Sequence, residues 1–334
     1  MRRVLLDWLA CPACRGAPLD LAVERARSRT DFAREGDGED VLEGALRCPD
    51  CQASYAVRQG IPRLLVGGVV PPQGSAHRWT RFDPLVPEWE QSFRDCASPL
   101  EPKDFLGKVV LDAGCGFGRH AYFAARYGAD VVAMDAARDA VHAAQRNTQD
   151  VAGVHVVQGD VLRPPFRDAS FDIVYSFGVL HHVDSPENAL EVLHGLLKSG
   201  GRLALWVYGP RQGLMSRVGD WMGRRTAELE PDELHRLSVA VAYGLRAGSH
   251  VPYRILRRVP VASQVATHLP GHDHYRWPLP VVTADVYDRL KNPVRTTFTG
   301  EELEGWLARH GYASIAVRRR VRNSESFGAV ALRR

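Results

Sequence analysis

From residue 109 onward, apolar and polar positions alternate in the manner of an α/β domain. Short apolar runs at 109–111, 131–134 and 154–158 predict buried strands, and two segments with helical spacing, 118–127 and 138–148, separate them. Strands that alternate with helices pair in parallel. This order therefore predicts a parallel sheet that binds its ligand at the carboxyl ends of the strands.

A glycine-rich loop, Asp112-Ala-Gly-Cys-Gly-Phe-Gly118, follows the first of these strands. Glycines allow a tight turn and a close backbone approach to a ligand, and the helix that follows presents free N–H groups. The residues from Gly116 to Ala121 also satisfy the dinucleotide pattern G-x-G-x-x-A. An NAD enzyme is therefore an alternative at this stage.

Three carboxylates at the predicted strand ends help to distinguish NAD from other nucleotide cofactors. Asp112 directly precedes the glycines, where it would oppose a pyrophosphate but suits a cofactor that carries an ammonium group. Asp135 ends the second strand, where a carboxylate accepts hydrogen bonds from the ribose hydroxyls of either cofactor. Asp160, followed by Val161, comes after the third strand and suits the exocyclic amine of adenine. Together they favour S-adenosylmethionine (SAM).

Near the N-terminus, four of the six cysteines form two C-x-x-C pairs, Cys11 with Cys14 and Cys48 with Cys51. Two such turns supply the tetrahedral thiolate set that structural Zn²⁺ prefers, with no open position for chemistry. Polar, Gly-containing residues 28–40 between the pairs suit a flexible excursion. Unrelated pairs or a redox C-x-x-C are the alternative, although a redox motif would not need duplicating.

Three motifs in residues 1–66 carry a first resemblance: Leu9-Ala-Cys-Pro-Ala-Cys14, Leu46-Arg-Cys-Pro-Asp-Cys51 and Gly60-Ile-Pro-Arg-Leu-Leu65. They resemble the small zinc-ribbon family that activates eukaryotic RNA and protein methyltransferases as a separate subunit. Similar ribbons are fused to methyltransferase domains in bacteria.

The second resemblance rests on the glycine loop and on three later segments, 171–176, 178–183 and 197–203. In order, these look like the fourth strand, the loop after it and the turn into the fifth strand of class I SAM-dependent methyltransferases of the ubiquinone/menaquinone-biosynthesis type. Ser199 stands where that turn usually has Pro. The resemblance spans about residues 109–208.

These resemblances imply a Rossmann-like α/β fold with a mostly parallel seven-stranded sheet, a four-cysteine zinc ribbon and a helical cap insertion. Asp112, Gly114 and Gly116 would border the methionine part of SAM, Asp135 its ribose, Asp160 and Val161 its adenine, and Phe177 the methyl-bearing sulfonium. Cys115 reads as a small packed residue rather than a nucleophile.

The expected organisation has five parts: ribbon 1–68, linker and helical segment 69–108, SAM-binding core 109–210, helical substrate cap 211–290 and closing segment 291–334. The linker begins at a Pro- and Gly-bearing joint, 67–74, and continues into an aromatic stretch that includes Trp79, Phe82, Trp89 and Phe93. The closing segment should contain a helix at 300–310, capped by Thr299 with Glu302, and two antiparallel strands at 314–322 and 324–332.

The cap segment 211–280 contains ten Arg against six Asp or Glu. This excess predicts an anionic acceptor held by groups such as Arg254, Arg257 and Arg258, with a solvated basic helix face as the alternative. Candidate proton acceptors are His272 and His274 in a cap loop, and His181 and His182 after the fourth strand, although a histidine there is also a plausible pocket wall. A sulfonium is already activated, so positioning alone supplies much of the acceleration.

The 334 residues, 45% of them apolar, suffice for a globular enzyme, and no apolar run approaches the roughly 20 residues of a membrane span. We expect a cytoplasmic methyltransferase acting on a small-molecule metabolite or natural-product intermediate at O, N or C. An RNA or protein methyltransferase is an alternative, but residues 1–68 balance ten Arg with ten acidic residues, which argues against a nucleic-acid partner. Aminocarboxypropyl transfer, cyclisation of SAM and an idle scaffold are further alternatives.

Overall fold

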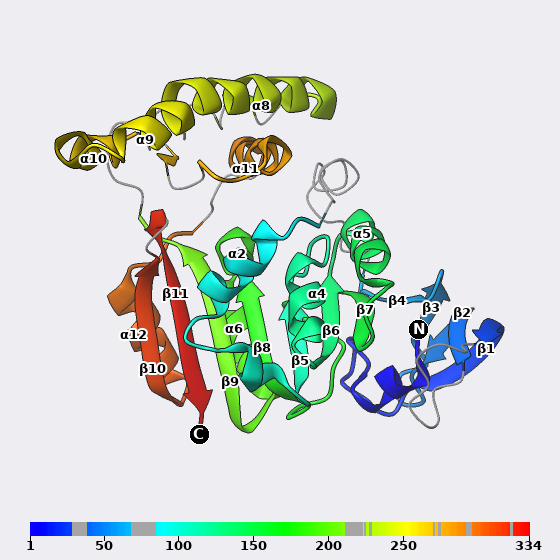
Figure 1. Cartoon of the computed structure of the whole chain (residues 1–334). Helices are drawn as coiled ribbons and strands as arrows, with labels where there is room; N and C mark the ends of the chain where they lie inside the picture. Colours follow the sequence, from blue (N-terminus) through cyan, green and yellow to red (C-terminus); the bar gives the residue numbers. More distant parts are fainter. Residues whose placement is uncertain are drawn as a thin grey trace.

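The computed structural model describes residues 1–28, 39–67, 85–210, 223, 225–226, 229–269, 271–272, 275–291, 296–320 and 323–334. One sheet of eleven strands runs through these parts of the chain, in the order β1-β2-β3-β4-β7-β6-β5-β8-β9-β11-β10 (Figure 1). Within it, the seven strands from β7 to β10 form the expected class I methyltransferase sheet. The predicted fold class is therefore confirmed.

The strands of this central sheet are β5 (Val109–Ala113), β6 (Asp130–Asp135), β7 (Val154–Gly159), β8 (Phe171–Phe177), β9 (Leu197–Tyr208), β10 (Tyr312–Arg320) and β11 (Asn323–Arg333). Strands β5 to β9 pair in parallel, whereas β11 is antiparallel to both β9 and β10. The predicted strands lie within two residues of these bounds. Residues 321–322, at the end of the predicted strand 314–322, lie outside the described residues.

Helices cover both faces of the central sheet. The first face carries α2 (Glu88–Ala97), α3 (Pro102–Phe105), α4 (Arg119–Arg126) and α5 (Arg138–Thr148), and the opposite face carries α6 (Pro186–Leu196) and α12 (Gly300–Arg309). Adjacent strand residues supply the two cores, because side chains alternate along a strand: Val110 packs with Phe93 of α2, and Leu111 belongs to the core that contains Leu193 of α6. Helix α12 begins with the predicted capping box, since Thr299 accepts from the Glu302 N–H at 3.1 Å.

The N-terminal ribbon is built from a 3-10 turn, η1 (Arg3–Asp7), and strands β1 (Asp20–Ser28), β2 (Glu39–Arg47), β3 (Ser54–Arg58) and β4 (Ile61–Leu64). Strands β1 to β4 pair antiparallel in order, and β4 then pairs in parallel with β7. Leu5 and Leu9 of the ribbon belong to the same buried core as Val157 and Phe166 of the methyltransferase domain. The ribbon thus extends the sheet and shares its core, which the sequence did not indicate.

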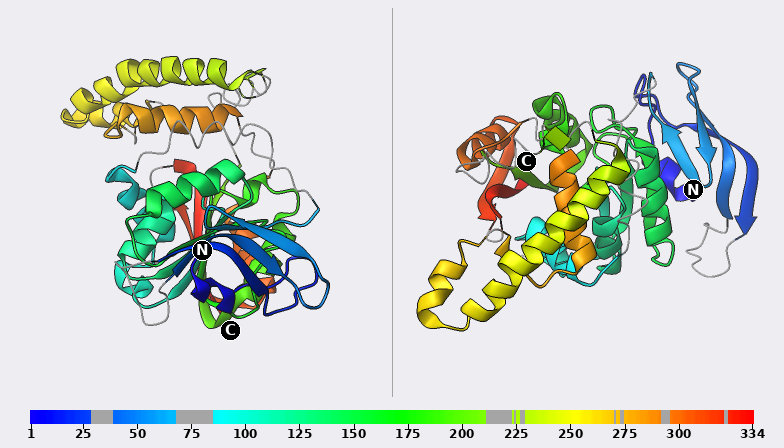
Figure 2. Two further views of the ribbon diagram at one scale, coloured as in Figure 1. Left: turned by 90° about the vertical axis from the view of Figure 1, so that its right-hand side faces the viewer. Right: turned by 90° about the horizontal axis from the view of Figure 1, so that it is seen from above.

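The cap is helical, as expected. It comprises α8 (Pro231–Leu245), a π-helical turn η3 (Arg246–His250), α9 (Val251–Leu256), α10 (Pro260–Ala266) and α11 (Leu279–Lys291). Leu234 of α8 packs with Tyr287 and Leu290 of α11 in a separate small core. Figure 2 shows that α9 and α10 project beyond the edge of the central sheet. The cap therefore has a part above the sheet and a protruding corner.

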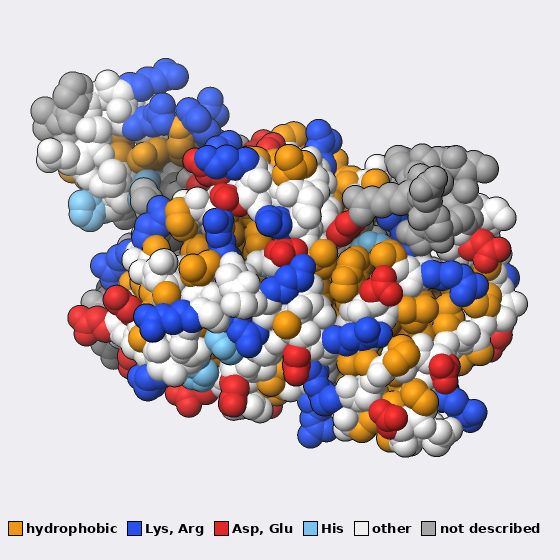
Figure 3. Space-filling model, turned by 90° about the horizontal axis from the view of Figure 1, so that it is seen from below, with side chains coloured by type: hydrophobic (Ala, Val, Ile, Leu, Met, Phe, Trp, Pro, Cys, Tyr) orange, Lys and Arg blue, Asp and Glu red, His pale blue; other side chains and the backbone are white. Residues whose placement is uncertain are grey.

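None of the helices in the described ranges is long and apolar enough to cross a membrane. Seen from below, the molecule presents acidic and basic side chains intermixed over most of its surface (Figure 3). This face shows no continuous basic track of the kind that nucleic-acid backbones require. Trp79, Phe82, His274, residues 29–38 of the expected flexible excursion and residues 68–74 of the predicted joint lie outside the described residues.

Candidate SAM site

The glycine loop turns over the end of β6. The N–H groups of Gly114 and Cys115 both donate to the Met134 carbonyl, at 2.8 and 2.9 Å. The Gly116 N–H donates to Asp135 Oδ2 at 3.0 Å, and the Ala137 N–H donates to Asp135 Oδ1 at 2.9 Å. The predicted ribose-binding carboxylate is thus held at the strand end by backbone donors from two sides, and it joins the loops after β5 and β6.

Gly114 is required by both conformation and space. Its φ of +94° lies in the left-handed region, and a Cβ atom there would stand 2.3 Å from Val179 Cγ2 in the loop after β8. The two loops that should flank the cofactor are therefore in direct contact.

We expect Gly114→Ala to lower the free energy of unfolding by about 2–4 kcal/mol, combining left-handed strain with overpacking. Denaturant titration measures the loss. Adding Val179→Ala should recover part of it, because the crowding methyl groups are removed. If the effects of Gly114→Ala and Val179→Ala on the unfolding free energy were additive, the contact with Val179 would not be the cause of the loss.

Asp112 is completely enclosed at the carboxyl end of β5, with 1% of its surface exposed. Burial raises the pKa of this carboxyl to about 8, the nearby Tyr175 hydroxyl partly opposes that rise, and the charge of Asp135 adds to it. The carboxyl is therefore largely neutral at neutral pH, and a neighbouring positive charge would favour its ionised form.

This pKa makes stability depend on pH. The folded protein binds the Asp112 proton up to about pH 8, whereas in the unfolded chain the carboxyl has its ordinary pKa of 3.8. The protonated carboxyl therefore contributes fully to the stability of the fold below about pH 4, and this contribution is lost as pH rises towards 8. We expect Asp112→Asn to be more stable than the natural protein by a few kcal/mol at pH 8.5, with little difference at pH 4.5. Denaturant titration at both pH values measures this difference. If the two proteins differed by the same unfolding free energy at pH 4.5 and at pH 8.5, the raised pKa of Asp112 would be contradicted.

Asp160 follows β7, beside β6. Its Oδ1 accepts from the Leu162 N–H at 3.0 Å, which fixes a tight turn and buries Val161. Gln158, the register partner of Asp135, donates through Nε2 to the Ala136 carbonyl at 2.9 Å. The predicted ribose and adenine carboxylates therefore end adjacent strands that are cross-linked by a side chain.

Phe177, the last residue of β8, is 6% exposed and stacks on Tyr175, with ring centroids 4.8 Å apart. It also meets His120, in the first turn of α4, at 5.3 Å. The predicted wall residue for the sulfonium is thus part of the aromatic core under α2 and α4. Asp112, the glycine loop, Asp135, Asp160 and Phe177 all lie at the carboxyl ends of β5 to β8.

His181 and His182 lie in the short turn η2 (Leu180–His182) after β8. His181 is fully buried, and its ring meets that of Tyr208, at the end of β9, at 4.4 Å. His272, by contrast, contacts residues of the cap: its Nδ1 lies 3.0 Å from the Leu269 carbonyl, and its ring is 5.0 Å from that of Tyr253. The structure thus places the first pair beside the strand ends and His272 beside the cap helices.

Trp89 of α2 connects three parts of the molecule, a role that the sequence did not reveal. Its ring lies 6.1 Å from Phe117 of the glycine loop and 5.7 Å from Trp277 of the cap, and the guanidinium of Arg119 lies 4.2 Å above it. The only sequence signal was an aromatic residue in the presumed linker. Trp89 packs the cap against the end of the glycine loop.

The two cysteine pairs sit on matching turns. The Cys11 carbonyl accepts from the Arg15 N–H at 2.8 Å and the Cys48 carbonyl from the Gln52 N–H at 3.0 Å, and Arg15 and Gln52 both have positive φ. Each turn therefore presents its cysteine sulfurs on one side.

All four sulfurs lie within 4.8 Å of one another. The Cys11–Cys51 and Cys14–Cys48 separations are 3.6 and 3.5 Å. Zn–S bonds of about 2.3 Å in a tetrahedron separate the sulfurs by roughly 3.8 Å. The thiolate set therefore fits Zn²⁺.

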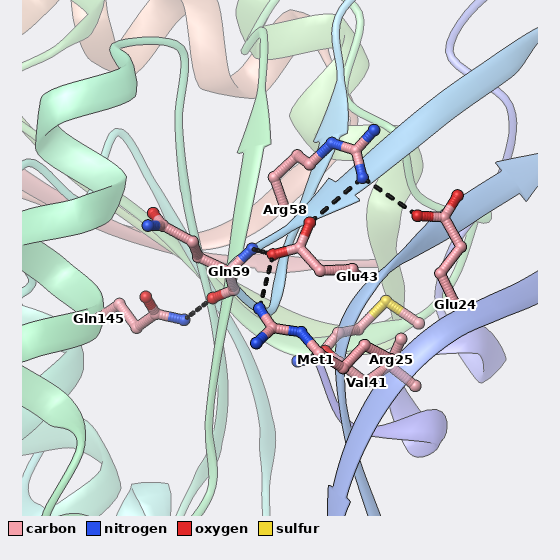
Figure 4. A network of polar contacts seen from close by, with 8 residues as sticks. All are labelled: Met1, Glu24, Arg25, Val41, Glu43, Arg58, Gln59 and Gln145. Carbon is pink, nitrogen blue, oxygen red and sulfur yellow. Dashed lines mark hydrogen bonds and ion pairs between the residues drawn. The ribbon is translucent and has the colours of Figure 1, made fainter.

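Polar contacts join this ribbon to the methyltransferase domain. Gln145 of α5 donates to the Gln59 carbonyl at 2.8 Å, and Glu43 accepts from the Gln59 N–H and from Arg58 (Figure 4). On the other face, Arg167 donates to the Leu9 carbonyl at 3.1 Å. The ribbon is anchored to both faces of the sheet edge.

Comparisons with known proteins agree with this architecture. Residues 2–60 match the family described as Trm112p-like protein, and residues 111–205 match the one described as methyltransferase domain. The chain is 36% identical over 165 residues to the ubiquinone biosynthesis O-methyltransferase of Roseobacter denitrificans, covering 43% of the chain but only 62% of that relative. Some curated relatives are thus matched over less than two thirds of their length.

Another ubiquinone biosynthesis O-methyltransferase, from Chromobacterium violaceum, is 30% identical over 209 residues, covering 55% of the chain and 85% of the relative. A solved complex of the Haloferax volcanii Trm112 methyltransferase activator with a methyltransferase is 14% identical, has a TM-score of 0.45 and covers 79% of this chain and 98% of that one. On the strength of the two family models and the curated relatives, the chain belongs to the SAM-dependent methyltransferases of the ubiquinone- and menaquinone-biosynthesis type, with a Trm112-like domain at its N-terminus.

Proposed function

We propose that the protein binds SAM across the carboxyl ends of β5, β6 and β7 and transfers its methyl group to a small-molecule acceptor. The observation that carries this proposal is the position of Asp112, Asp135 and Asp160 at the carboxyl ends of β5, β6 and β7, beside a glycine turn whose N–H groups bond to β6. A parallel sheet binds ligands at this edge, where its strand order reverses beside β5.

Asp135 would hold the ribose. A carboxylate offers about four acceptor positions, and the Gly116 and Ala137 N–H groups occupy two of them. A carboxylate held in this way at a strand end suits the two hydroxyls of a ribose. Asp160 would accept from the adenine amine beside Val161, and Asp112 would lie near the ammonium end, where a positive charge would favour its ionised form.

SAM, when bound, supplies a methyl group on an activated sulfonium. The chain would contribute orientation and exclusion of water, with Phe177 and the loop from Gly178 to His182 near the reacting end. His181 is the better placed candidate to receive an acceptor proton, because it lies beside the strand ends. For His272, with its contacts in the cap, we propose a structural role at the cap helices.

Labelled products test the reaction. We would incubate the protein with methyl-labelled SAM and the low-mass fraction of a cell extract, and analyse the nucleoside product by mass spectrometry. S-adenosylhomocysteine together with label in small molecules is the expected result. Methylthioadenosine would indicate attack on the amino-acid arm, and label confined to added RNA or protein would replace the small-molecule proposal with a macromolecular one.

The ribbon would hold one structural Zn²⁺. Its four sulfurs form a closed set, so the metal would stabilise the fold and take no part in methyl transfer.

A further inference from the structure

The protruding corner of the cap, residues 243–268, combines two features that soluble surfaces usually keep apart. Of the seven large apolar side chains exposed in the described ranges, five lie in this corner, at Tyr243, Val251, Ile255, Val259 and Val265. Ile255 and Val265 are 62% and 69% exposed. Such clustering on a projecting element marks an interaction surface rather than chance exposure.

The charge of the same segment has one sign. From residue 234 to residue 272 the sequence contains five Arg and no Asp or Glu. Arg254, Arg257 and Arg258 are exposed on and directly after α9. Figure 3 shows Lys and Arg side chains gathered beside hydrophobic ones at this projecting part of the molecule.

The spacing places the two kinds of residue side by side. Val251 and Ile255 lie four residues apart in α9, on one side of the helix, and Val259 follows in the turn before α10; these three exposed residues are the apolar stripe. Arg254 follows Val251 by three residues, about 60° round α9 from it, and Arg257 and Arg258 stand in the turn between Ile255 and Val259. Exposed apolar side chains flanked by arginines are the pattern of a segment that lies in a lipid–water interface.

A polar hollow between α9 and α10 adds anion-binding groups to the same corner. Its lining includes Arg257, Arg258, Ser263, Thr267 and His268. Arg257 is held against Tyr275, with its guanidinium 5.0 Å from the ring centroid. Guanidinium and hydroxyl donors in one hollow suit a phosphate group.

We propose that this corner docks on an anionic phospholipid bilayer, with Val251, Ile255 and Val259 entering the interface and the hollow taking a lipid phosphate. Charge complementarity selects this occupant, because the segment carries no acidic residue that would repel the lipid. The cap follows β9 along the chain and lies over the carboxyl ends of the strands, so a docked bilayer would be on the side of the proposed SAM site (Figure 1).

Vesicle co-sedimentation of the full-length protein tests this surface without using activity. We expect binding to phosphatidylcholine vesicles that contain about 30% phosphatidylglycerol, weak binding to pure phosphatidylcholine and a marked loss in about 0.5 M salt. Arg254→Glu with Arg258→Glu, and Ile255→Ser with Val259→Ser, should each lower the partition coefficient at least tenfold.

The matched control is Lys103→Glu with Leu106→Ser. Both residues are strongly exposed, but they directly precede β5, at the amino ends of the strands and away from the cap. This variant should therefore bind vesicles like the natural protein. Circular dichroism and thermal unfolding would confirm that each variant is folded.

Several results would overturn the proposal: no binding by the natural protein at low salt, equal losses in the control variant, or binding of inorganic phosphate without vesicle binding. Two others would assign the corner to a different occupant. If Ile255→Ser with Val259→Ser changed the oligomeric mass instead, the stripe would be a self-association surface. If this double substitution changed SAM affinity instead, the stripe would be a surface that contacts the SAM-binding part of the same chain.

Discussion

Asp135→Ala should weaken SAM binding by about 100-fold or more in calorimetry. The substitution removes the acceptors proposed for two ribose hydroxyls, and hydrogen bonds to a charged group contribute about 1.5–3 kcal/mol each. It also releases the Gly116 N–H, which Asp135 holds at 3.0 Å, so the glycine loop loses one of its anchors to β6.

Asp150→Ala provides the matched control. Asp150 is exposed beyond the end of α5, so its removal should leave SAM affinity within about twofold, since surface substitutions of this kind have small effects. Asp135→Asn should give an intermediate result, because it keeps one acceptor oxygen and removes the charge. Unchanged SAM affinity in a folded Asp135→Ala protein would show that the ribose lies elsewhere.

Cys11→Ser should cost the bound Zn²⁺ and lower the unfolding temperature of the whole protein. Structural zinc contributes much of the folding free energy of small cysteine domains. The ribbon shares a buried core with the methyltransferase domain through Leu5, Leu9 and Phe166, so its unfolding would expose apolar surface on both. We expect a loss of several kcal/mol in the free energy of unfolding, well above that of an average substitution.

Cys96→Ala is the control for this loss. Cys96 is also buried, at 3% exposure, but it lies in α2 and outside the four-sulfur cluster. Its substitution should keep about one Zn²⁺ per chain in atomic absorption and cost about 1 kcal/mol. A Cys11→Ser protein that retained its zinc and its unfolding temperature would exclude the proposed metal centre.

Local patterns predicted much of the fold. Helix α5 occupies the predicted residues 138–148, because its apolar spacing is regular and it follows a strand directly. The capping box of Thr299 and Glu302 located the start of α12 for a similar reason: both partners are three residues apart. The positions of Asp112, Asp135 and Asp160 followed from the strand ends. Their grouping at one edge followed from parallel pairing.

Long-range pairing was not predictable in the same way. The segment Ile61–Leu64 reads as a short strand, but nothing in it specifies β7 as its partner, since an open sheet edge accepts any strand of suitable shape. The contact of Trp89 with both Phe117 and Trp277 joins residues far apart in the chain. The burial of His181 against Tyr208 likewise depends on how the loop after β8 packs on β9.

The proposed function depends on which nucleotide binds at the carboxyl ends of β5, β6 and β7. Calorimetric titration of the full-length protein with SAM, and separately with NAD and NADH, tests this directly. We predict saturable binding of SAM at about one per chain, with micromolar affinity, and no detectable heat from either dinucleotide. Binding of a dinucleotide with no binding of SAM would contradict the proposed site and the reaction derived from it.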